Sequence, residues 1–306
     1  MMPHSRCNCR CVMCDIWKAN NDKKELTTEE ISRHLPALEK LKVREVVLSG
    51  GEALMHNNLW TLCKMLKSKN IKVTLLSTGL LLRKFSKEIV DNVDEVIVSL
   101  DGSRDVHNKI RNIPEAFEKL ADGVKSIKDH KPAFRITGRC VLQKMNYFDL
   151  DNIIRSAKEI GLDQISFLPA DVSTTAFNHL GNVEVNEIDL SPSDVEAFER
   201  VMEATFHSSY SKDFVAESPD KLRRILKYYK NDHESPPCNA PWVSAVLESD
   251  GRLMPCFFHK EYGVLNGNDF ESVLNSKEAV EFRRQLNVKD NEVCKKCVCS
   301  LRLSMI

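Results

Sequence analysis

The sequence predicts an α/β fold, in which a parallel sheet or barrel is followed by a small C-terminal domain. Two observations lead to this prediction. β-rich runs alternate with amphipathic helical patterns up to residue 171, and beyond that point the alternation gives way to helices and one hairpin. The chain has 306 residues, of which 42% are hydrophobic, so it is long enough to bury a core of this size.

Five runs predict buried parallel strands, because their apolar residues are nearly continuous. These runs span residues 43–50, 71–79, 94–102, 134–143 and 163–171. Helices are expected between them, at residues 27–41, 57–68, 84–92, 114–129 and 150–161. The first of these helices should begin with a capping box made by Thr27 and Glu30, and Pro36 should kink it. Repeated strand and helix with right-handed crossovers then gives an α/β layer or a barrel.

The pattern changes after residue 171 and suggests three parts. Helices are expected at residues 192–207 and 219–231, a hairpin around residues 249–251, and one helix over 270–286. We therefore expect a core domain at 1–190, a helical linker at 191–237 and a cysteine-rich domain at 238–306. The first strand of the core is expected to be missing or short. Only six residues precede Cys7, and their sequence, MMPHSR, is not typical of a β-strand.

Charge and cysteine content narrow the class of protein. Lys plus Arg and Asp plus Glu both number 44, which leaves no basic footprint for nucleic acid. Since the chain has neither an apolar run of about 18 residues nor a signal peptide, we expect a cytoplasmic protein with no membrane partner. The cytosol keeps thiols reduced, so eleven cysteines indicate metal ligands. Most of them form two groups, Cys7, Cys9, Cys11 and Cys14 near the start and Cys238, Cys256, Cys294, Cys297 and Cys299 near the end.

The first group resembles the cluster loop of the radical SAM superfamily. Cys7, Cys11 and Cys14 have the spacing C-x3-C-x2-C, and "LSGGEAL" follows the next strand. The resemblance extends to residue 171 and implies a partial (β/α)6 barrel. It also implies a 4Fe-4S cluster on three thiolates, whose open iron chelates S-adenosylmethionine. An external donor such as flavodoxin or ferredoxin would supply the electron that releases a 5'-deoxyadenosyl radical. Cys9 falls in a slot that the family fills with an apolar residue, so we expect it to be buried.

The same resemblance implies which residues meet S-adenosylmethionine. The turn of Gly50, Gly51 and Glu52 would hold the methionine moiety, with Ala53 standing where the family usually has proline. Ser99 and Asp101 correspond to ribose contacts, and Arg139 could pair with the methionine carboxylate. Met13 takes a position that lies by the adenine. Two alternatives remain open: Asp101 as a turn residue at a strand end, and Arg139 in a structural ion pair.

The last quarter resembles the shortened SPASM module called a twitch domain, a β-hairpin plus helix. Cys238 is followed by Gly251-x4-Cys256 and by Cys294-x2-Cys297. Four thiolates would hold a second 4Fe-4S cluster completely and leave Cys299 spare. A zinc site is the alternative at either cysteine group.

A fully ligated second cluster suggests a two-electron oxidation, since it can accept an electron from a substrate radical. We expect a small polar substrate such as a sugar, cyclitol or other alcohol, because the chain lacks an N-terminal domain of about 80 residues that would grip a leader peptide. Asp171, His107 or Arg139 could take the proton, although Asp171 could instead cap a loop and His107 lie on the surface.

Other functions remain open. A radical SAM epimerase would use a thiol inside the barrel, where Cys140 is the candidate, whereas an outward Cys140 favours oxidation. A peptide-modifying maturase is a further alternative within enzymes. A non-catalytic zinc or redox protein is the alternative of another class.

Overall fold

The computed structural model describes residues 1–21, 24–171, 185–232, 235–265, 267, 269–299 and 301–303. The chain divides into two compact units. The first unit comprises Met1–Cys7, Ile16–Leu75 and Ser235–Ile306, and the second comprises Asn8–Asp15 and Leu76–Glu234. The domain boundaries expected at residues 190 and 237 stay a prediction.

The five predicted strands form one parallel sheet, which confirms the α/β prediction. They are β1 (Glu45–Leu48), β2 (Lys72–Ser77), β3 (Glu95–Ser99), β4 (Arg135–Leu142) and β5 (Gln164–Pro169). Their order in the sheet follows the sequence. The registers pair Val46 with Val73 in the first unit, and Ser99 with Arg139 and Arg139 with Ser166 in the second.

Helices connect the strands as the amphipathic patterns predict. Up to residue 229 they are η1 (Ile16–Asn21), α1 (Thr28–Lys40), η2 (Ala53–Met55), α2 (Leu59–Lys67), α3 (Ser86–Asn92), α4 (Arg104–Arg111), α5 (Ala116–His130), η3 (Tyr147–Asp149), α6 (Leu150–Glu159), α7 (Val185–Ile188), α8 (Pro192–Ser208) and α9 (Pro219–Tyr229). The capping box of Thr27 and Glu30 is present at α1, and the helix continues through Pro36. The sequence analysis missed α4, a short and highly charged helix.

The C-terminal residues form a small antiparallel sheet with helices. They comprise α10 (Ala240–Val243), β6 (Val246–Leu247), β7 (Arg252–Met254), β8 (Gly263–Val264), α11 (Phe270–Leu274), α12 (Lys277–Gln285) and α13 (Glu292–Lys295). The predicted hairpin is the β6–β7 pair, which turns at Gly251 with a φ of +84°. The single helix predicted over 270–286 is wrong, because Ser276 caps a new helix with its side chain on the N–H of Ala279.

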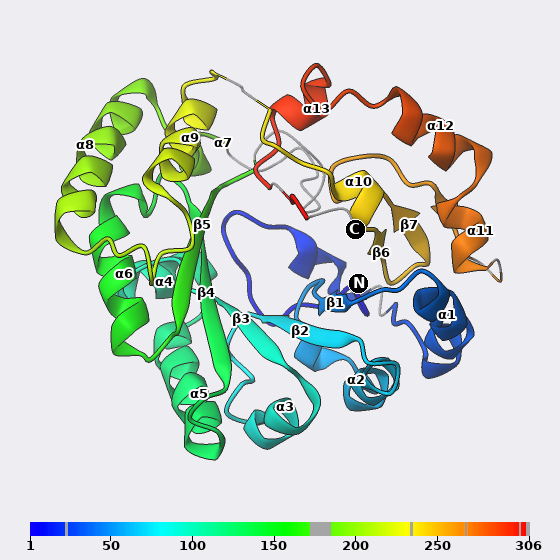
Figure 1. The fold of residues 1–306 in the computed structure, drawn as a ribbon. Coiled ribbons are helices and arrows are strands. Elements are labelled where there is room, and N and C mark those ends of the chain that lie inside the picture. The colour runs from blue at the N-terminus through cyan, green and yellow to red at the C-terminus, as the bar shows by residue number, and fades with distance from the viewer. Residues whose placement is uncertain are drawn as a thin grey trace. The chain divides into compact units, whose positions relative to one another are not determined.

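The strands of the second unit have one buried and one half-exposed face. On β4, Ile136, Cys140 and Leu142 are buried, whereas Arg139 and Val141 are half-exposed. A Cβ atom on Gly138 would meet the side chains of Leu162 and Ile165, so apolar side chains cover the face that carries Gly138 and Cys140. Figure 1 shows the helices of this unit gathered beside strands β3–β5.

Residues 210–229 close the β5 edge of this sheet. Val215 forms a parallel bridge with Ile165, and the N–H of Ile165 donates to the carbonyl of Phe214 at 2.9 Å. The buried Tyr229 hydroxyl donates to the carbonyl of Leu142 at 2.5 Å and accepts from the N–H of Ala170 at 3.0 Å. This one hydroxyl therefore ties α9 to the carboxyl ends of β4 and β5.

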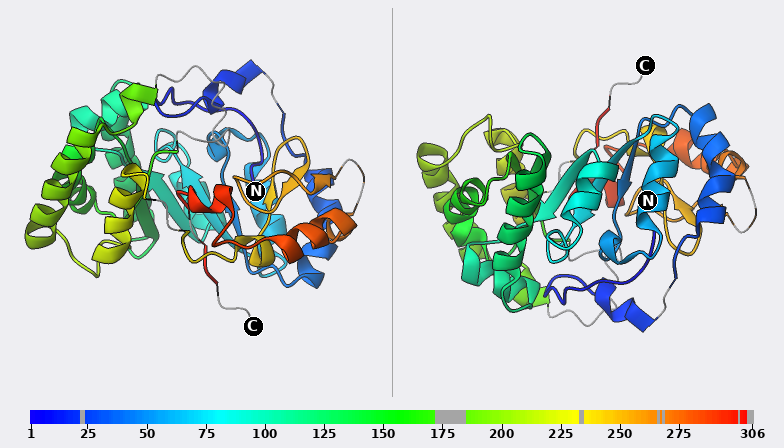
Figure 2. Two further views of the ribbon diagram at one scale, coloured as in Figure 1. Left: turned by 90° about the horizontal axis from the view of Figure 1, so that it is seen from above. Right: turned by 90° about the horizontal axis from the view of Figure 1, so that it is seen from below.

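The first unit joins both ends of the sequence. Met1 is hydrogen-bonded to Val47 and Ser49 beside β1, and the N–H of Met2 donates to the carbonyl of Leu247 at 2.7 Å. Helices α1 and α11 lie side by side, as Figures 1 and 2 show. The C-terminal sheet is thus part of the same compact unit as β1.

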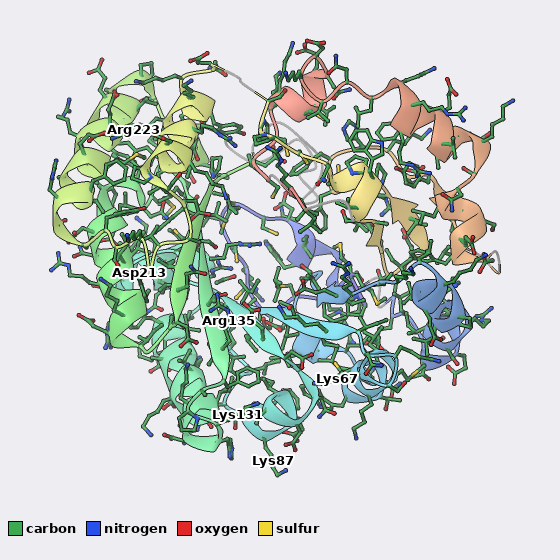
Figure 3. The ribbon with its side chains drawn as sticks, viewed as in Figure 1. Lys67, Lys87, Lys131, Arg135, Asp213 and Arg223 are labelled. Carbon is green, nitrogen blue, oxygen red and sulfur yellow. The ribbon has the colours of Figure 1, made fainter. Side chains whose placement is uncertain are left out.

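Surface charges are spread over the helices and the strand ends. Figure 3 labels six such residues, Lys67, Lys87, Lys131, Arg135, Asp213 and Arg223. Arg135 pairs with Glu95 at 3.1 Å and Arg223 with Glu203 at 3.1 Å, with the arginines about half exposed. Exposed pairs of this kind contribute roughly 0–1 kcal/mol, so the fold rests on the buried contacts instead. Within the part of the chain that the structure describes, none of the helices is both long and apolar enough to span a bilayer.

We expect Tyr229→Phe to lower the free energy of unfolding by about 0.5–1.5 kcal/mol, because the hydrogen bonds of the Tyr229 hydroxyl are lost while the N–H of Ala170 still donates to the carbonyl of Leu142 at 3.0 Å. Urea unfolding followed by circular dichroism measures the change. Tyr228→Phe is the control, since Tyr228 directly precedes Tyr229 on the same helix but is half-exposed. Equal effects of the two substitutions would contradict the role given to the Tyr229 hydroxyl.

Candidate functional site

The Gly50-Gly51-Glu52 turn holds the chain that leads into the first cysteine. A Cβ atom on Gly51 would lie 1.9 Å from the carbonyl oxygen of Arg6, and one on Gly50 would lie 2.7 Å from that of His4. Gly50 also has a φ of +115°, which L side chains rarely adopt. The N–H of Glu52 donates to the carbonyl of Arg6 at 2.8 Å. The absence of side chains at both glycines therefore lets the backbone before Cys7 pack directly on the end of β1.

His4 secures the same contact from the other side. Its Nε2 donates to the carbonyl of Glu52 at 2.6 Å, while its Nδ1 accepts from the N–H of Arg6 at 2.9 Å. Burial lowers the pKa of His4 to about 4, so the ring is neutral at neutral pH and can fill both roles. The Glu52 side chain is fully buried, and its Oε1 accepts from the N–H of Leu54 at 3.1 Å.

The rest of the cysteine loop, residues 8–15, lies along the last turn of α4. The N–H groups of Arg10 and Val12 donate to the carbonyls of Arg111 and Ile110 at 3.3 and 3.1 Å. Cys9 and Cys11 are buried, as predicted for Cys9, and Cys14 and Met13 are half-exposed. Two backbone hydrogen bonds thus attach the loop to the C-terminal end of α4.

A buried ion pair stands next to Cys11. Asp101, with no solvent exposure, pairs with Arg111, and Nη1 of Arg111 lies 3.5 Å from the sulfur of Cys11. Burial alone would lower the pKa of Arg111, but the charges of Asp101 and Cys11 outweigh it and raise that pKa. Hydrogen bonding from Cys9 and, against the effect of burial, the charge of Arg111 lower the pKa of Cys11 to about 6.

Asp101 also organises the neighbouring backbone. Its Oδ1 accepts from the N–H of Val141 at 2.9 Å, and its carbonyl accepts from Asn146 at 2.7 Å. The sequence analysis weighed a ribose contact against a structural role for Asp101. In the structure the Asp101 carboxylate pairs with Arg111 of α4 and accepts from the N–H of Val141 of β4. Sequence reasoning missed Arg111, since a lone arginine in a polar helix has no motif spacing to mark it.

His107 is buried, whereas the sequence analysis considered a surface position. Its Nδ1 accepts from the N–H of Asp101 at 3.1 Å, and its Nε2 is buried without a hydrogen-bond partner. Burial and the charge of Arg111 lower the pKa of His107 to about 3. An imidazole in these surroundings is a weak proton acceptor.

Ser99 and Arg139 meet on the half-exposed face of the sheet. They are register partners, and Arg139 is in turn the partner of Ser166, whose hydroxyl lies 3.5 Å from Nε of Arg139. Ser166 is a member of this polar row that the sequence analysis did not identify. Alternation along β4 would have revealed the row once the register was known.

Cys140 and Asp171 lie at other positions around these strands. Cys140 is on the opposite face of β4 from Arg139, fully buried, with the side-chain amide of Asn146 3.6 Å from its sulfur. Burial raises the pKa of the Cys140 thiol well above its usual value. Asp171 follows β5 and is buried, and the residues after it, 172–184, lie outside the described part of the chain.

The second cysteine group gathers in the C-terminal part of the first unit. Burial, together with the charges of Cys256 and Cys238, raises the pKa of Cys294 to about 11. Burial also raises the pKa of Cys297, with Cys299, Cys256 and Cys238 among the further influences. Thiols affect one another in this way only when their sulfurs share one neighbourhood. The thiols of the four predicted ligands are therefore near enough to influence one another, and their role as cluster ligands stays a prediction.

Further contacts orient these thiols. The Nε2 of His259 lies 3.3 Å from the sulfur of Cys294, and the ring packs edge-on against Phe282. The thiol of Cys297 donates to the carbonyl of Cys299 at 2.5 Å, so Cys299 contributes its backbone. His259 was not identified from the sequence, where a single histidine in a hairpin loop has no distinctive pattern.

The chemistry of these donor sets fits iron–sulfur clusters. Among the described residues, no group of three or more His, Cys, Asp and Glu side chains is arranged around a point that would hold a single metal ion. A four-iron cluster needs its thiolates further apart, because the irons and sulfides lie between them. Cys7, Cys11 and Cys14 would leave one iron of a cluster open, whereas Cys238, Cys256, Cys294 and Cys297 would leave none, and both ligand sets stay predictions.

Comparisons with known proteins identify the family. Residues 1–164 match the model of the radical SAM superfamily, and residues 238–298 match SPASM, an iron-sulfur cluster-binding domain. The chain belongs to the radical SAM superfamily, and it is a radical SAM enzyme that carries a SPASM domain. The resemblance seen in the sequence is thereby confirmed, together with its cofactors, a 4Fe-4S cluster with S-adenosylmethionine and further iron–sulfur binding in the SPASM domain. That the SPASM domain holds one cluster stays a prediction.

Several curated proteins are similar to the chain. The antilisterial bacteriocin subtilosin biosynthesis protein AlbA of Bacillus subtilis is 24% identical over 301 residues, covering 96% of this chain and 63% of AlbA. A probable GTP 3',8-cyclase of Sulfurisphaera tokodaii is 27% identical over 267 residues, with 83% of this chain and 79% of that protein covered. The chain thus spans less than two thirds of AlbA.

Solved structures share the fold. Streptococcus suis SuiB bound to S-adenosylmethionine has a TM-score of 0.68 at 14% identity, covering 98% of this chain and 71% of SuiB. Native anSMEcpe with bound AdoMet has a TM-score of 0.69 at 18% identity, covering 97% of this chain and 85% of that one. This likeness supports the predicted fold of a radical SAM core with a small C-terminal domain.

We expect Gly51→Ala to disrupt the approach of the cysteine loop, because the new methyl group would overlap the carbonyl of Arg6. Iron bound per chain should fall by about half, as only the first of two clusters is affected. Gly263→Ala is the matched control, since the nearest atom to its new Cβ would be a side-chain methyl of Val273 at 3.2 Å. Wild-type iron content in Gly51→Ala would contradict this role.

Proposed function

We propose that the protein is an oxidoreductase that cleaves S-adenosylmethionine reductively and oxidises a small polar substrate by two electrons. Removal of one hydrogen atom leaves a substrate radical. Loss of a proton and of one electron then gives the oxidised product, with a second 4Fe-4S cluster as the electron acceptor. The observation that carries the proposal is the shared neighbourhood of Cys238, Cys256, Cys294 and Cys297, which offers a fully ligated cluster with no iron left for substrate.

The residues around the first cluster would bind and orient S-adenosylmethionine. Cys7, Cys11 and Cys14 are the proposed ligands. When bound, the cluster and S-adenosylmethionine together supply the species that abstracts hydrogen, given an electron from a donor such as flavodoxin or ferredoxin. In our proposal Ser99 and Arg139, on the half-exposed face, contact the ribose and the methionine carboxylate. Gly50, Gly51 and Glu52 are the proposed contacts of the methionine moiety, and Met13 that of the adenine.

Two side chains favour oxidation over epimerisation. Cys140 is fully buried on the face of β4 opposite Arg139, so its thiol is poorly located to return a hydrogen atom to a substrate on the Arg139 face. Asp171, at the carboxyl end of β5, is our choice as proton acceptor, because the low pKa of His107 makes that imidazole a weak base.

The second candidate is a peptide-modifying maturase. It is favoured by the similarity to AlbA, a protein of subtilosin biosynthesis, over 96% of this chain. Incubation with deuterated alcohols or sugars on the one hand and with peptides on the other separates the two candidates. Deuterium transfer into 5'-deoxyadenosine from alcohols or sugars supports oxidation of small molecules, and transfer from peptides alone would replace it with the maturase.

We expect Cys11→Ala to abolish the cleavage of S-adenosylmethionine by the dithionite-reduced protein, because the first cluster loses a ligand. Chromatography of 5'-deoxyadenosine measures the cleavage. Cys9→Ala should keep most of the activity, since the side chain at this position serves as a small buried group. Full cleavage by Cys11→Ala would refute the assignment of the loop.

The double substitution Cys294→Ala/Cys297→Ala should remove about half of the bound iron, because two of the four ligands of the second cluster are lost. We expect it to leave uncoupled cleavage of S-adenosylmethionine largely intact and to stop formation of oxidised product. Iron analysis and product chromatography measure both effects. A thermal melt serves as the control, since a lost cluster can lower stability. Formation of oxidised product at the wild-type rate by a folded variant would contradict the role of the second cluster as electron acceptor.

A further inference from the structure

The strongest unassigned feature of the second unit is the contact between Arg111 and a proposed cluster ligand. Arg111 is 6% exposed, and its guanidinium has two partners in different directions. Nη2 pairs with the carboxylate of Asp101, whereas Nη1 points to the sulfur of Cys11 at 3.5 Å. Guanidinium groups present several donors in a fixed plane, so one anchored edge determines the aim of the other.

The surroundings hold this arrangement in place. Asp101 cannot turn away, because its Oδ1 accepts from the N–H of Val141 and its carbonyl accepts from Asn146. The backbone carbonyl of Arg111 accepts from the N–H of Arg10, which ties the same residue to the cysteine loop twice. His107, one turn earlier on α4, is neutral in these surroundings, so Arg111 is the buried cation that this helix turns toward the loop.

We infer that Arg111 is a positioning residue that makes the first cluster easier to reduce, by donating a hydrogen bond and presenting a fixed positive charge to the sulfur of Cys11. The inference rests on the proposed function, in which Cys11 is a cluster ligand. Reduction adds negative charge to a cluster, and hydrogen bonds and cations at the ligand sulfurs stabilise that charge. The Asp101–Arg111 pair acts as a dipole with its positive end at the sulfur, since Arg111 contacts Cys11 directly.

The test is the midpoint potential of the first cluster in the anaerobically reconstituted full chain. Electron paramagnetic resonance follows the titration without S-adenosylmethionine, which the reduced protein would cleave. A separate sample frozen soon after its addition identifies the signal of the first cluster, because binding at the open iron changes that signal. Arg111→Met should shift the potential of the first cluster to more negative values and leave the second cluster unchanged. Arg111→Lys keeps the positive charge but loses the planar guanidinium that contacts two partners at once, so it should shift the potential of the first cluster less.

Two further variants guard the test. Arg111→Met leaves Asp101 as an unpaired buried charge, so Asp101→Asn/Arg111→Met removes both charges while retaining an acceptor for the N–H of Val141. This double variant should still show a negative shift, smaller than that of Arg111→Met, because the negative charge of Asp101 is also removed. Arg104→Met is the matched control, because Arg104 lies on the same helix but pairs with Glu118 at the surface. The midpoint potential of the first cluster in this variant should equal that of the wild type.

The outcomes separate this inference from the proposed function. A wild-type potential in an iron-loaded double variant would overturn the role of Arg111 alone. A loss of iron without any shift of the remaining signal would also overturn it, in favour of a purely structural pair. A wild-type protein without a signal that responds to S-adenosylmethionine would overturn the proposed function and the inference with it.

Discussion

A carboxylate removed from water is the constraint on which the second unit depends. Asp101 has no solvent exposure, and an ionised group in that position is stable only with a counterion and hydrogen-bond donors. Its requirements are met by Arg111 of α4 and by the N–H of Val141 of β4. Satisfying this one group therefore fixes the position of α4 beside the sheet, and with it the support for residues 8–15.

The two cysteine groups are controlled by different physical means. Near the chain start, the backbone before Cys7 is located by bare glycine main chain, and Cys11 has an arginine at its sulfur. Near the C-terminus, burial and the charges of neighbouring thiols raise the pKa of Cys294 and Cys297. Those thiols must release their protons when they bind iron, so metal binding itself creates the charge there.

Periodicity and spacing predicted most of the fold and the cysteine sets. The apolar runs of β3 to β5 are long enough to mark buried strands, and alternation along β4 also separates Arg139 from Cys140. Helix α4 was missed because its eight residues include four Arg, Lys or Asp side chains and no sustained apolar stripe. The contact of Arg111 with Asp101 and Cys11 joins residues up to 100 positions apart, which local patterns cannot reveal. The break between α11 and α12 follows a local signal, since Ser276 caps the N–H of Ala279, and serine is a preferred residue at a helix start.

The interleaving of the first unit has a consequence for biosynthesis. Met2 is hydrogen-bonded to Leu247, Lys40 of α1 pairs with Glu271 of α11 at 2.8 Å, and Ser235–Ile306 belongs to the same unit as β1. A ribosome delivers the amino-terminal partner of each contact long before the carboxyl-terminal one. The unit that contains Cys7 therefore cannot close during translation until roughly the last quarter of the chain has emerged, and contacts of such long range fold slowly.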